Sequence, residues 1–261
     1  MILCNEKNKK EIIDYIGQDY GKCLYLYIDL LKYGLSNKNI NMWWQKKGED
    51  ITVLVFQYYS GVHVFSKDEE FDVEDVIALL KEISPSMICG MESVITKLSD
   101  YLSQDYELEI GYVAELGDCR DFGDTESYSA EENELPELAA FLATDEALGK
   151  PYGLELLKTQ LLERYREGFG RNYIMRIQGD IVATASTYAE KENIAVISGV
   201  MVDPDYRGKG LSKKVLSALC QELKTEGKRV FSYYYIESAM RMHKAVGFEK
   251  IGNWAKLVQN N

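Results

Sequence analysis

The spacing of apolar residues in the first half of the chain predicts a mixture of helices and strands. Residues 9–35 carry apolar side chains at helical spacing with breaks at Gly17 and Gly21, which predicts two helices. The following segments predict strands at 51–59 and 61–65, a helix at 73–83, a strand at 86–89, a helix at 92–102 and a strand at 107–115.

The second half shows the same kinds of pattern in a clear order. The spacing predicts helices at 135–143 and 154–167, strands at 173–178, 181–188 and 194–202, a helix at 209–225, a strand at 230–235, a helix at 238–246 and a strand at 248–257. The order α-α-β-β-β-α-β-α-β predicts an α/β or α+β domain in which helices flank a mixed sheet.

The segment between the halves has few apolar residues. Residues 117–134 are rich in acidic residues, Ser and Gly, which predicts a linker. A chain of 261 residues suits two domains. The sequence therefore predicts an N-terminal domain at 1–125 and a second domain at 126–261.

Charge differs sharply between the halves. Residues 1–134 hold 12 Lys and Arg against 27 Asp and Glu, whereas 135–261 hold 18 against 15, so the halves carry −15 and +3. An acidic half repels phosphates, which argues against a nucleic-acid ligand and favours an amine-bearing partner. An acidic surface that serves solubility alone is the other explanation.

Cysteine spacing and hydropathy bear on the cellular setting. The five cysteines are odd in number and lack C-x-x-C spacing, so they indicate neither a disulfide framework nor a metal site. The apolar run at 51–56 is much shorter than the roughly 20 residues of a membrane span. No secretory signal is visible at the N-terminus. These features predict a cytoplasmic protein.

The segment at 200–216 contains the clearest functional motif. An apolar strand leads through Asp203 and Pro204 into a glycine-rich loop and then a helix. Glycines at 208 and 210 let backbone N–H groups approach a ligand, beside the positive end of the helix dipole. This arrangement predicts phosphate binding.

Nearby cations and the helix that follows strengthen this prediction. Four positive side chains within eight residues suit a ligand with several phosphates: Arg207, Lys209, Lys213 and Lys214. The helix has an apolar stripe with a period of four residues. Neither a P-loop nor a G-x-G-x-x-G dinucleotide fingerprint is present, which disfavours a nucleotide-binding module.

The strand leads through the loop V-D-P-D-Y-R-G-K-G-L-S to the amphipathic helix, then to a second strand and a short helix that ends in A-V-G-F. This order of elements and motifs resembles the GNAT superfamily of acetyl-CoA-dependent N-acetyltransferases. The resemblance implies that an R-x-x-G-x-G/A loop wraps the pyrophosphate of coenzyme A. The loop residues would be Arg207, Gly208, Lys209, Gly210, Leu211 and Ser212, with serine where the family prefers Gly or Ala.

The resemblance also implies a bulge in the strand before this loop. In the family a free backbone N–H meets the thioester carbonyl, and the pantetheine arm pairs with the strand edge. The matching residues are Gly199, Val200, Met201 and Val202. A glycine within a strand suits a bulge, although close packing would also explain Gly199.

Two candidates exist for the proton donor to the leaving thiolate. His243 stands where the family commonly has tyrosine, and a histidine can donate a proton near neutral pH. The alternative is a buried helix histidine, with Tyr235 or a neighbouring tyrosine at 233 or 234 supplying the hydroxyl. Glu190 and Glu192 are weak candidates for the base because they fall in an expected turn, so the base stays unassigned.

The N-terminal half lacks the glycine loop but could be a degenerate copy of the same fold. Without this loop and with a charge of −15, the N-terminal half is not expected to bind coenzyme A, so its expected roles are to shape the acceptor site and to pair subunits in a homodimer. The leading hypothesis is direct transfer of acetyl from acetyl-CoA to an amine of a small molecule or peptide, without metal. The alternative is a non-catalytic acyl-CoA-binding or regulatory protein.

Overall fold

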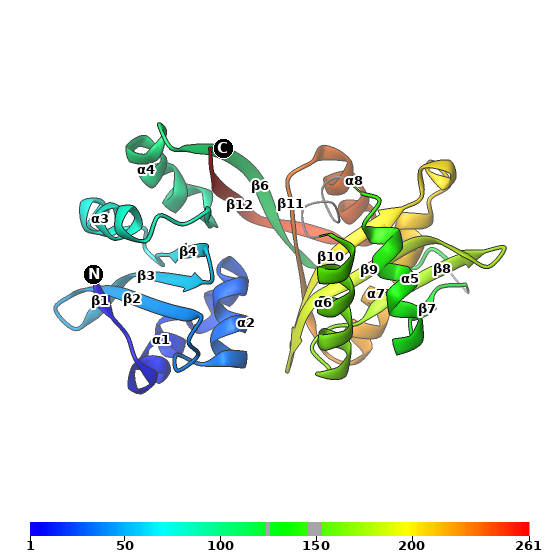
Figure 1. Ribbon diagram of the computed structural model, residues 1–261, viewed down its shortest axis with the longest axis horizontal. Helices are drawn as coiled ribbons and strands as arrows, with labels where there is room; N and C mark the ends of the chain where they lie inside the picture. Colours follow the sequence, from blue (N-terminus) through cyan, green and yellow to red (C-terminus); the bar gives the residue numbers. More distant parts are fainter. Residues whose placement is uncertain (124–125, 146–152, 261) are drawn as a thin grey trace. The chain divides into compact units, whose positions relative to one another are not determined.

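The computed structural model describes residues 1–123, 126–145 and 153–260, which divide into two compact units (Figure 1). Unit 1 comprises Met1–Val113 with Lys250–Asn261, and unit 2 comprises Ala114–Glu249. The chain enters unit 2 within β6 (Tyr106–Leu116) and returns to unit 1 within β12 (Phe248–Gln259). The sequence predicts the domain boundary between residues 125 and 126. Residues 124–125 lie outside the part of the chain that the structure describes.

Unit 1 is a mixed sheet with two helices on each face. Its strands follow the order β1-β2-β3-β4-β5-β12, and only the β4–β5 pair is parallel among the pairs described. The elements are β1 (Ile2–Leu3), α1 (Lys9–Ile16), α2 (Leu24–Tyr33), β2 (Ile40–Lys47), β3 (Asp50–Tyr58), β4 (Gly61–Phe65), α3 (Val73–Ile83), β5 (Met87–Met91) and α4 (Glu92–Leu102).

Unit 2 has a sheet of the order β7-β8-β9-β10-β11, with a parallel pair at β10–β11. The elements are β7 (Tyr128–Ser129), α5 (Leu135–Leu142), α6 (Leu154–Arg166), β8 (Asn172–Ile177), β9 (Asp180–Lys191), β10 (Ile194–Val202), α7 (Leu211–Thr225), β11 (Arg229–Tyr234) and α8 (Glu237–Val246). The mixed α/β fold predicted from the sequence is confirmed.

The two units repeat one order of elements. Along the chain the order is strand, two helices, three strands, helix, strand, helix and strand from β1 to β6, and the same order from β7 to β12, although β12 pairs with β5 in the sheet of unit 1. The strand order within each sheet also repeats, and the parallel pair falls at the same place. The connection at 66–72 in unit 1 therefore corresponds to the glycine-rich loop at 203–210 in unit 2.

Apolar side chains fill the space between each sheet and its helices. In unit 1 the core includes Val64, Ile77 and Leu98, which join β4 to α3 and α4. In unit 2 one face packs Met201 against α5 and α6. The apolar stripe of α7 is buried as the sequence predicts: Leu211, Val215, Leu216, Leu219, Cys220 and Leu223.

The sequence pattern left β2 undetected. This strand alternates buried residues at Ile40, Met42 and Trp44 with more exposed neighbours, but its polar end at 45–47 weakens the pattern. Strands β1 and β7, of two residues each, are too short for periodicity to reveal. Among the described helices, none is long and apolar enough to cross a membrane.

Candidate functional site

A bulge interrupts β10 where the sequence places it. Ser198 pairs with Ser186 of β9, whereas Met201 pairs with Thr184, so β10 has one extra residue between these pairs. Gly199 lies in the bulge with φ of +56°, a conformation that favours glycine. Its backbone geometry, in addition to close packing, therefore accounts for this glycine.

The described pairing of β10 with its parallel neighbour ends just before the bulge. The pairing of β10 with β11 runs from Ile194↔Arg229 to Ile197↔Ser232. β10 then continues to Val202 and β11 to Tyr234. Residues 198–202 have no described pairing with β11, and we call this unpaired edge of β10 the opening, where an extended ligand could pair with the strand.

The loop after β10 combines glycine geometry with a helix start. Gly208 and Gly210 both have φ of +80°, and Gly210 precedes the first residue of α7. The amides of Lys213 and Lys214 donate to the Gly210 carbonyl at 3.1 and 3.3 Å. The N–H groups of Leu211 and Ser212 come before these first intrahelical bonds and are suited to bind an anion.

Cations surround this helix start in an open arrangement. Arg207 is exposed and its Nε donates to the Val202 carbonyl at 3.3 Å. Lys209 is also exposed, with its Nζ 4.5 Å from the centre of the Tyr206 ring. The half-buried Lys213 places its Nζ 5.7 Å from the Phe122 ring. The loop thus offers backbone donors and positive charge to one polyanionic ligand.

His243 lies in a buried position on α8. Its Nε2 is 2.8 Å from the Ser232 hydroxyl and its Nδ1 is 2.8 Å from the Ala239 carbonyl. The ring also stacks on Tyr234 with centroids 4.9 Å apart. Loss of hydration lowers its pKa to about 4, so the ring is neutral near pH 7.

The three consecutive tyrosines separate as strand alternation predicts. Tyr234 is buried on the side of α8, whereas Tyr233 and Tyr235 are half-buried. Tyr235 follows the last residue of β11, past the point where β10 and β11 part. This places Tyr235 at the end of the strand that borders the opening.

The sequence analysis did not single out Ser186, which lies under the bulge. Its side chain is 3% exposed, and its hydroxyl has no hydrogen-bond partner among the described groups. The hydroxyl oxygen is 3.6 Å from the position that a Cβ on Gly199 would take. Only the register of β9 against β10 reveals this neighbour, because no local motif contains it.

Glu190 belongs to an ion-pair network, and the expectation that it lies in a turn was wrong. Glu190 is the next-to-last residue of β9 and is buried. Its carboxylate accepts hydrogen bonds from the Arg171 guanidinium at 2.8 Å and pairs with Lys228 Nζ at 3.0 Å. Because Arg171 also pairs with Glu222 and Glu226 near the end of α7, this network lies far along the helix from the glycine loop.

The corresponding connection in unit 1 has the opposite charge. Residues 66–72 contain four carboxylates, no glycine and one lysine. The Asp72 side chain accepts hydrogen bonds from the amides of Glu74 and Asp75, which occupies the helix N-terminus that stays open in unit 2.

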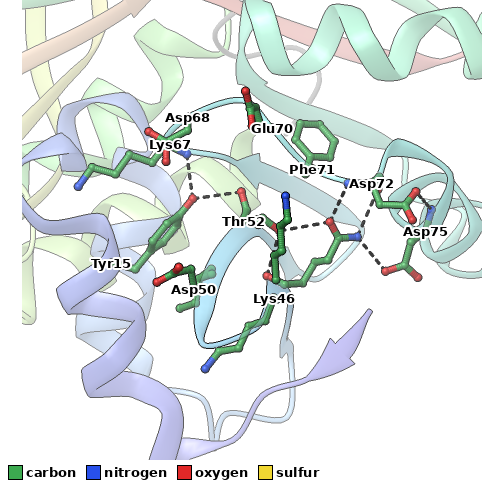
Figure 2. A pocket seen from close by; sticks show the side chains of 13 residues that line it. Tyr15, Lys46, Asp50, Thr52, Lys67, Asp68, Glu70, Phe71, Asp72 and Asp75 are labelled. Atoms are coloured by element: carbon green, nitrogen blue, oxygen red, sulfur yellow. Dashed lines mark hydrogen bonds between the residues drawn. The ribbon is translucent and has the colours of Figure 1, made fainter.

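A pocket of about 820 Å³ lies beside this connection (Figure 2). Five carboxylates and three lysines are among its lining residues: Asp50, Asp68, Glu70, Asp72 and Asp75, with Lys46, Lys47 and Lys67. Lys46 pairs with Glu11, and Lys67 lies 3.7 Å from Asp19. Because these two lysines are paired with carboxylates outside the pocket, the excess negative charge of the lining disfavours a phosphate group.

The parallel pair of unit 1 has as many paired positions as that of unit 2, but its first strand ends at Phe65, one residue after the last pair. β4 pairs with β5 from Gly61↔Met87 to Val64↔Gly90. A Cβ on Gly90 would lie 2.4 Å from the Val64 carbonyl oxygen, so glycine permits this close approach. Unit 1 therefore lacks the anion loop, and β4 lacks the unpaired extension that β10 has at 198–202.

No group of three or more His, Cys, Asp or Glu side chains that could hold a metal ion occurs in the described part of the chain. The cysteines at 4, 23, 89, 119 and 220 are free thiols.

Comparison with known proteins agrees with this geometry. The acetyltransferase (GNAT) family model matches residues 130–248, which include the bulge, the loop and α8. An uncharacterized N-acetyltransferase of Methanocaldococcus jannaschii is 25% identical over 111 residues, which cover 38% of this chain. The match spans about half, 48%, of the length of that relative.

Two solved structures are similar over nearly the whole chain. An acetyltransferase of the GNAT family from Colwellia psychrerythraea has a TM-score of 0.61 at 11% identity, covering 95% of this chain and 97% of its own. A tandem GNAT protein from the clavulanic acid biosynthesis pathway has a TM-score of 0.61 at 10% identity, covering 99% and 97%. At these identities the likeness concerns the fold.

Proposed function

Because residues 130–248 form a domain of the acetyltransferase (GNAT) family, we propose that this protein transfers an acetyl group from acetyl-CoA to an amine of a small molecule or peptide. The single observation that carries this proposal is the opening between β10 and β11, which leads from the bulge at Gly199 to the glycine loop at 207–212.

The chain's own groups suit the parts of this donor. The amides around Leu211 and Ser212, with Arg207 and Lys209, would bind the pyrophosphate. The edges of Met201 and Val202 would pair with the pantetheine arm, and the N–H of Val200 would donate to the thioester carbonyl. When bound, acetyl-CoA supplies a thioester that an amine can attack.

In the transfer step, the amine nitrogen forms a bond to the thioester carbon while the carbon–sulfur bond breaks. The nitrogen must lose a proton, and the leaving thiolate gains one. We propose Tyr235 as the donor, because it lies at the strand end beside the opening. His243, the other candidate, is neutral near pH 7 and uses both ring nitrogens in hydrogen bonds, so its surroundings argue for a positioning role.

Unit 1 would take a different part in this function. Its capped helix start, acidic connection and short β4 support the proposal that it does not bind coenzyme A. We propose that unit 1 shapes the acceptor site or pairs subunits in a homodimer. We further propose that the protein acts in the cytoplasm, with neither nucleic acid nor a membrane as a partner. The excess of carboxylates in unit 1 favours an acceptor that carries positive charge.

Turnover with a panel of amines tests the proposed activity. The protein is incubated with acetyl-CoA and primary amines that range from diamines to peptides, and the released thiol is measured with a thiol reagent. We expect thiol release that depends on both substrates, with an acetylated amine detected by mass. Binding of acetyl-CoA without release for any amine would favour the non-catalytic alternative.

A further inference from the structure

Three polar side chains lie side by side across the sheet of unit 2, next to the bulge in β10. Asn172 of β8 pairs with Ser186 of β9, and Ser186 pairs in turn with Ser198 of β10. Residues that pair directly in an antiparallel sheet project their side chains from the same face, about 5 Å apart. Asn172, Ser186 and Ser198 therefore form a continuous row, which we call the polar row. Its last member, Ser198, directly precedes Gly199 of the bulge.

The polar row belongs to the face of the sheet that α5 and α6 cover. At the next pairs along these strands, Thr184 of β9 lies between Ile174 of β8 and Met201 of β10. Ile174 and Met201 pack in one core cluster with apolar residues of both helices. Because residues two apart on a strand share a face, the row lies on the same side of the sheet as this cluster. The row thus places three neutral polar side chains on this face, beside the bulge.

The polar row is largely buried, and its hydrogen bonds are incomplete. Asn172 is 4% exposed and Ser186 is 3% exposed, whereas Ser198 is half-buried. The Ser186 hydroxyl has no hydrogen-bond partner, and the Asn172 and Ser198 side chains form no hydrogen bond with any group that the structure describes. Thr184 differs, because its hydroxyl donates to the Tyr173 carbonyl at 2.9 Å. Buried polar groups without partners cost free energy, so the row points to a bound group that completes their hydrogen bonds.

The chemistry of the row narrows the kind of group that it can bind. A serine hydroxyl both donates and accepts a hydrogen bond, and the Asn172 amide offers an acceptor oxygen and a donor nitrogen. The row carries no charge, so it would leave a buried ammonium or carboxylate without a counter-charge. A hydroxyl or an amide suits the row better, because each of these groups also donates and accepts while it stays neutral.

We propose that the polar row binds a hydroxyl or amide group of the acceptor and so selects amines that carry such a group near the nitrogen. This inference rests on the proposed acetyl transfer, in which the Val200 N–H would donate to the thioester carbonyl. An acceptor bound at the row holds its amine near that carbonyl, because one residue separates Ser198 from Val200. An amine with a methyl group in place of the hydroxyl leaves the buried Ser186 hydroxyl unpaired, which discriminates against it.

A matched pair of small amines tests the proposal. 2-Aminoethanol and propylamine have the same chain length and differ in a hydroxyl against a methyl group. With acetyl-CoA and the full chain, we expect kcat/KM to be at least about 10-fold higher for 2-aminoethanol. Ser186→Ala and Ser198→Ala should each bring this ratio closer to one. Thr184→Val is the matched control, because it removes a hydroxyl from the same face that already has a partner, and it should leave the ratio unchanged.

A binding measurement keeps the polar row separate from the proposed activity. Thermal unfolding is followed with coenzyme A and either amine. We expect 2-aminoethanol to raise the midpoint more than propylamine does in the parent protein and in Thr184→Val, but not in Ser186→Ala. If the midpoints follow this pattern and neither amine is acetylated, the acetyl transfer is wrong and the row is supported. Equal midpoint shifts for the two amines, equal values of kcat/KM, or an unchanged preference in Ser186→Ala would overturn the proposal.

Discussion

Single residues show how far a motif can identify a chemical role. The sequence places His243 at the position of the family's tyrosine, but it does not reveal the surroundings of the ring. The structure adds bonds to Ser232 and Ala239 and a stacked Tyr234, and burial of the ring lowers its pKa, so the imidazole is neutral near pH 7. The sequence does not reveal the role of Glu190 either, because its ion-pair partners Arg171 and Lys228 come from other parts of the chain.

A pair of variants separates the two proton-donor candidates. We expect Tyr235→Phe to lower kcat by roughly 100-fold with little effect on coenzyme A affinity, because removal of a general acid commonly costs that much. His243→Asn should lower the thermal midpoint, since two buried hydrogen bonds change, and should alter kcat only a few-fold. Steady-state kinetics and thermal unfolding of both variants provide the measurements.

The opposite pattern would restore His243 as the donor. A 100-fold loss of kcat in a folded His243→Asn protein, together with near-normal kcat in Tyr235→Phe, is the result that contradicts this assignment. The wild-type pH profile is a weaker test, because deprotonation of the amine substrate raises the rate over the same range.

At the scale of elements, periodicity predicts most helices and strands, because each buries one regular face. The helix expected at 73–83 matches α3, and that expected at 92–102 matches α4. Periodicity does not predict how strands are paired. The end of the β10–β11 pairing and the neighbour Ser186 both depend on pairing between distant segments.

The start of α3 provides a test of the difference between the two units. Asp72→Ala removes the carboxylate that accepts from the amides of Glu74 and Asp75, so we expect a loss of about 1 kcal/mol in the free energy of unfolding. Asp68→Ala removes an exposed carboxylate from the same connection and should change the free energy of unfolding by less than about 0.5 kcal/mol. Urea unfolding measures both. Equal effects of the two substitutions would contradict the capping role.

For the whole molecule, two units share one order of elements and differ in charge and in local geometry. No repeat is detectable from identical residues, because a fold tolerates wide change in sequence when its apolar pattern is kept. The sequence nevertheless indicates the functional difference, since R-G-K-G occurs in unit 2 and K-D-E-E in unit 1. Only the structure shows that both tetrapeptides occupy corresponding connections.

The central claim is that unit 2 holds coenzyme A and unit 1 does not, and calorimetric titration of the full chain tests it most directly. We predict one coenzyme A per chain. The Gly208→Val, Gly210→Val double variant should show no binding, because side chains at φ of +80° distort the loop and block the phosphates. Gly179→Val, at φ of +98° in the turn after β8, is the matched control and should bind normally. Two coenzyme A molecules per chain, or unchanged affinity in the double variant, would contradict the account.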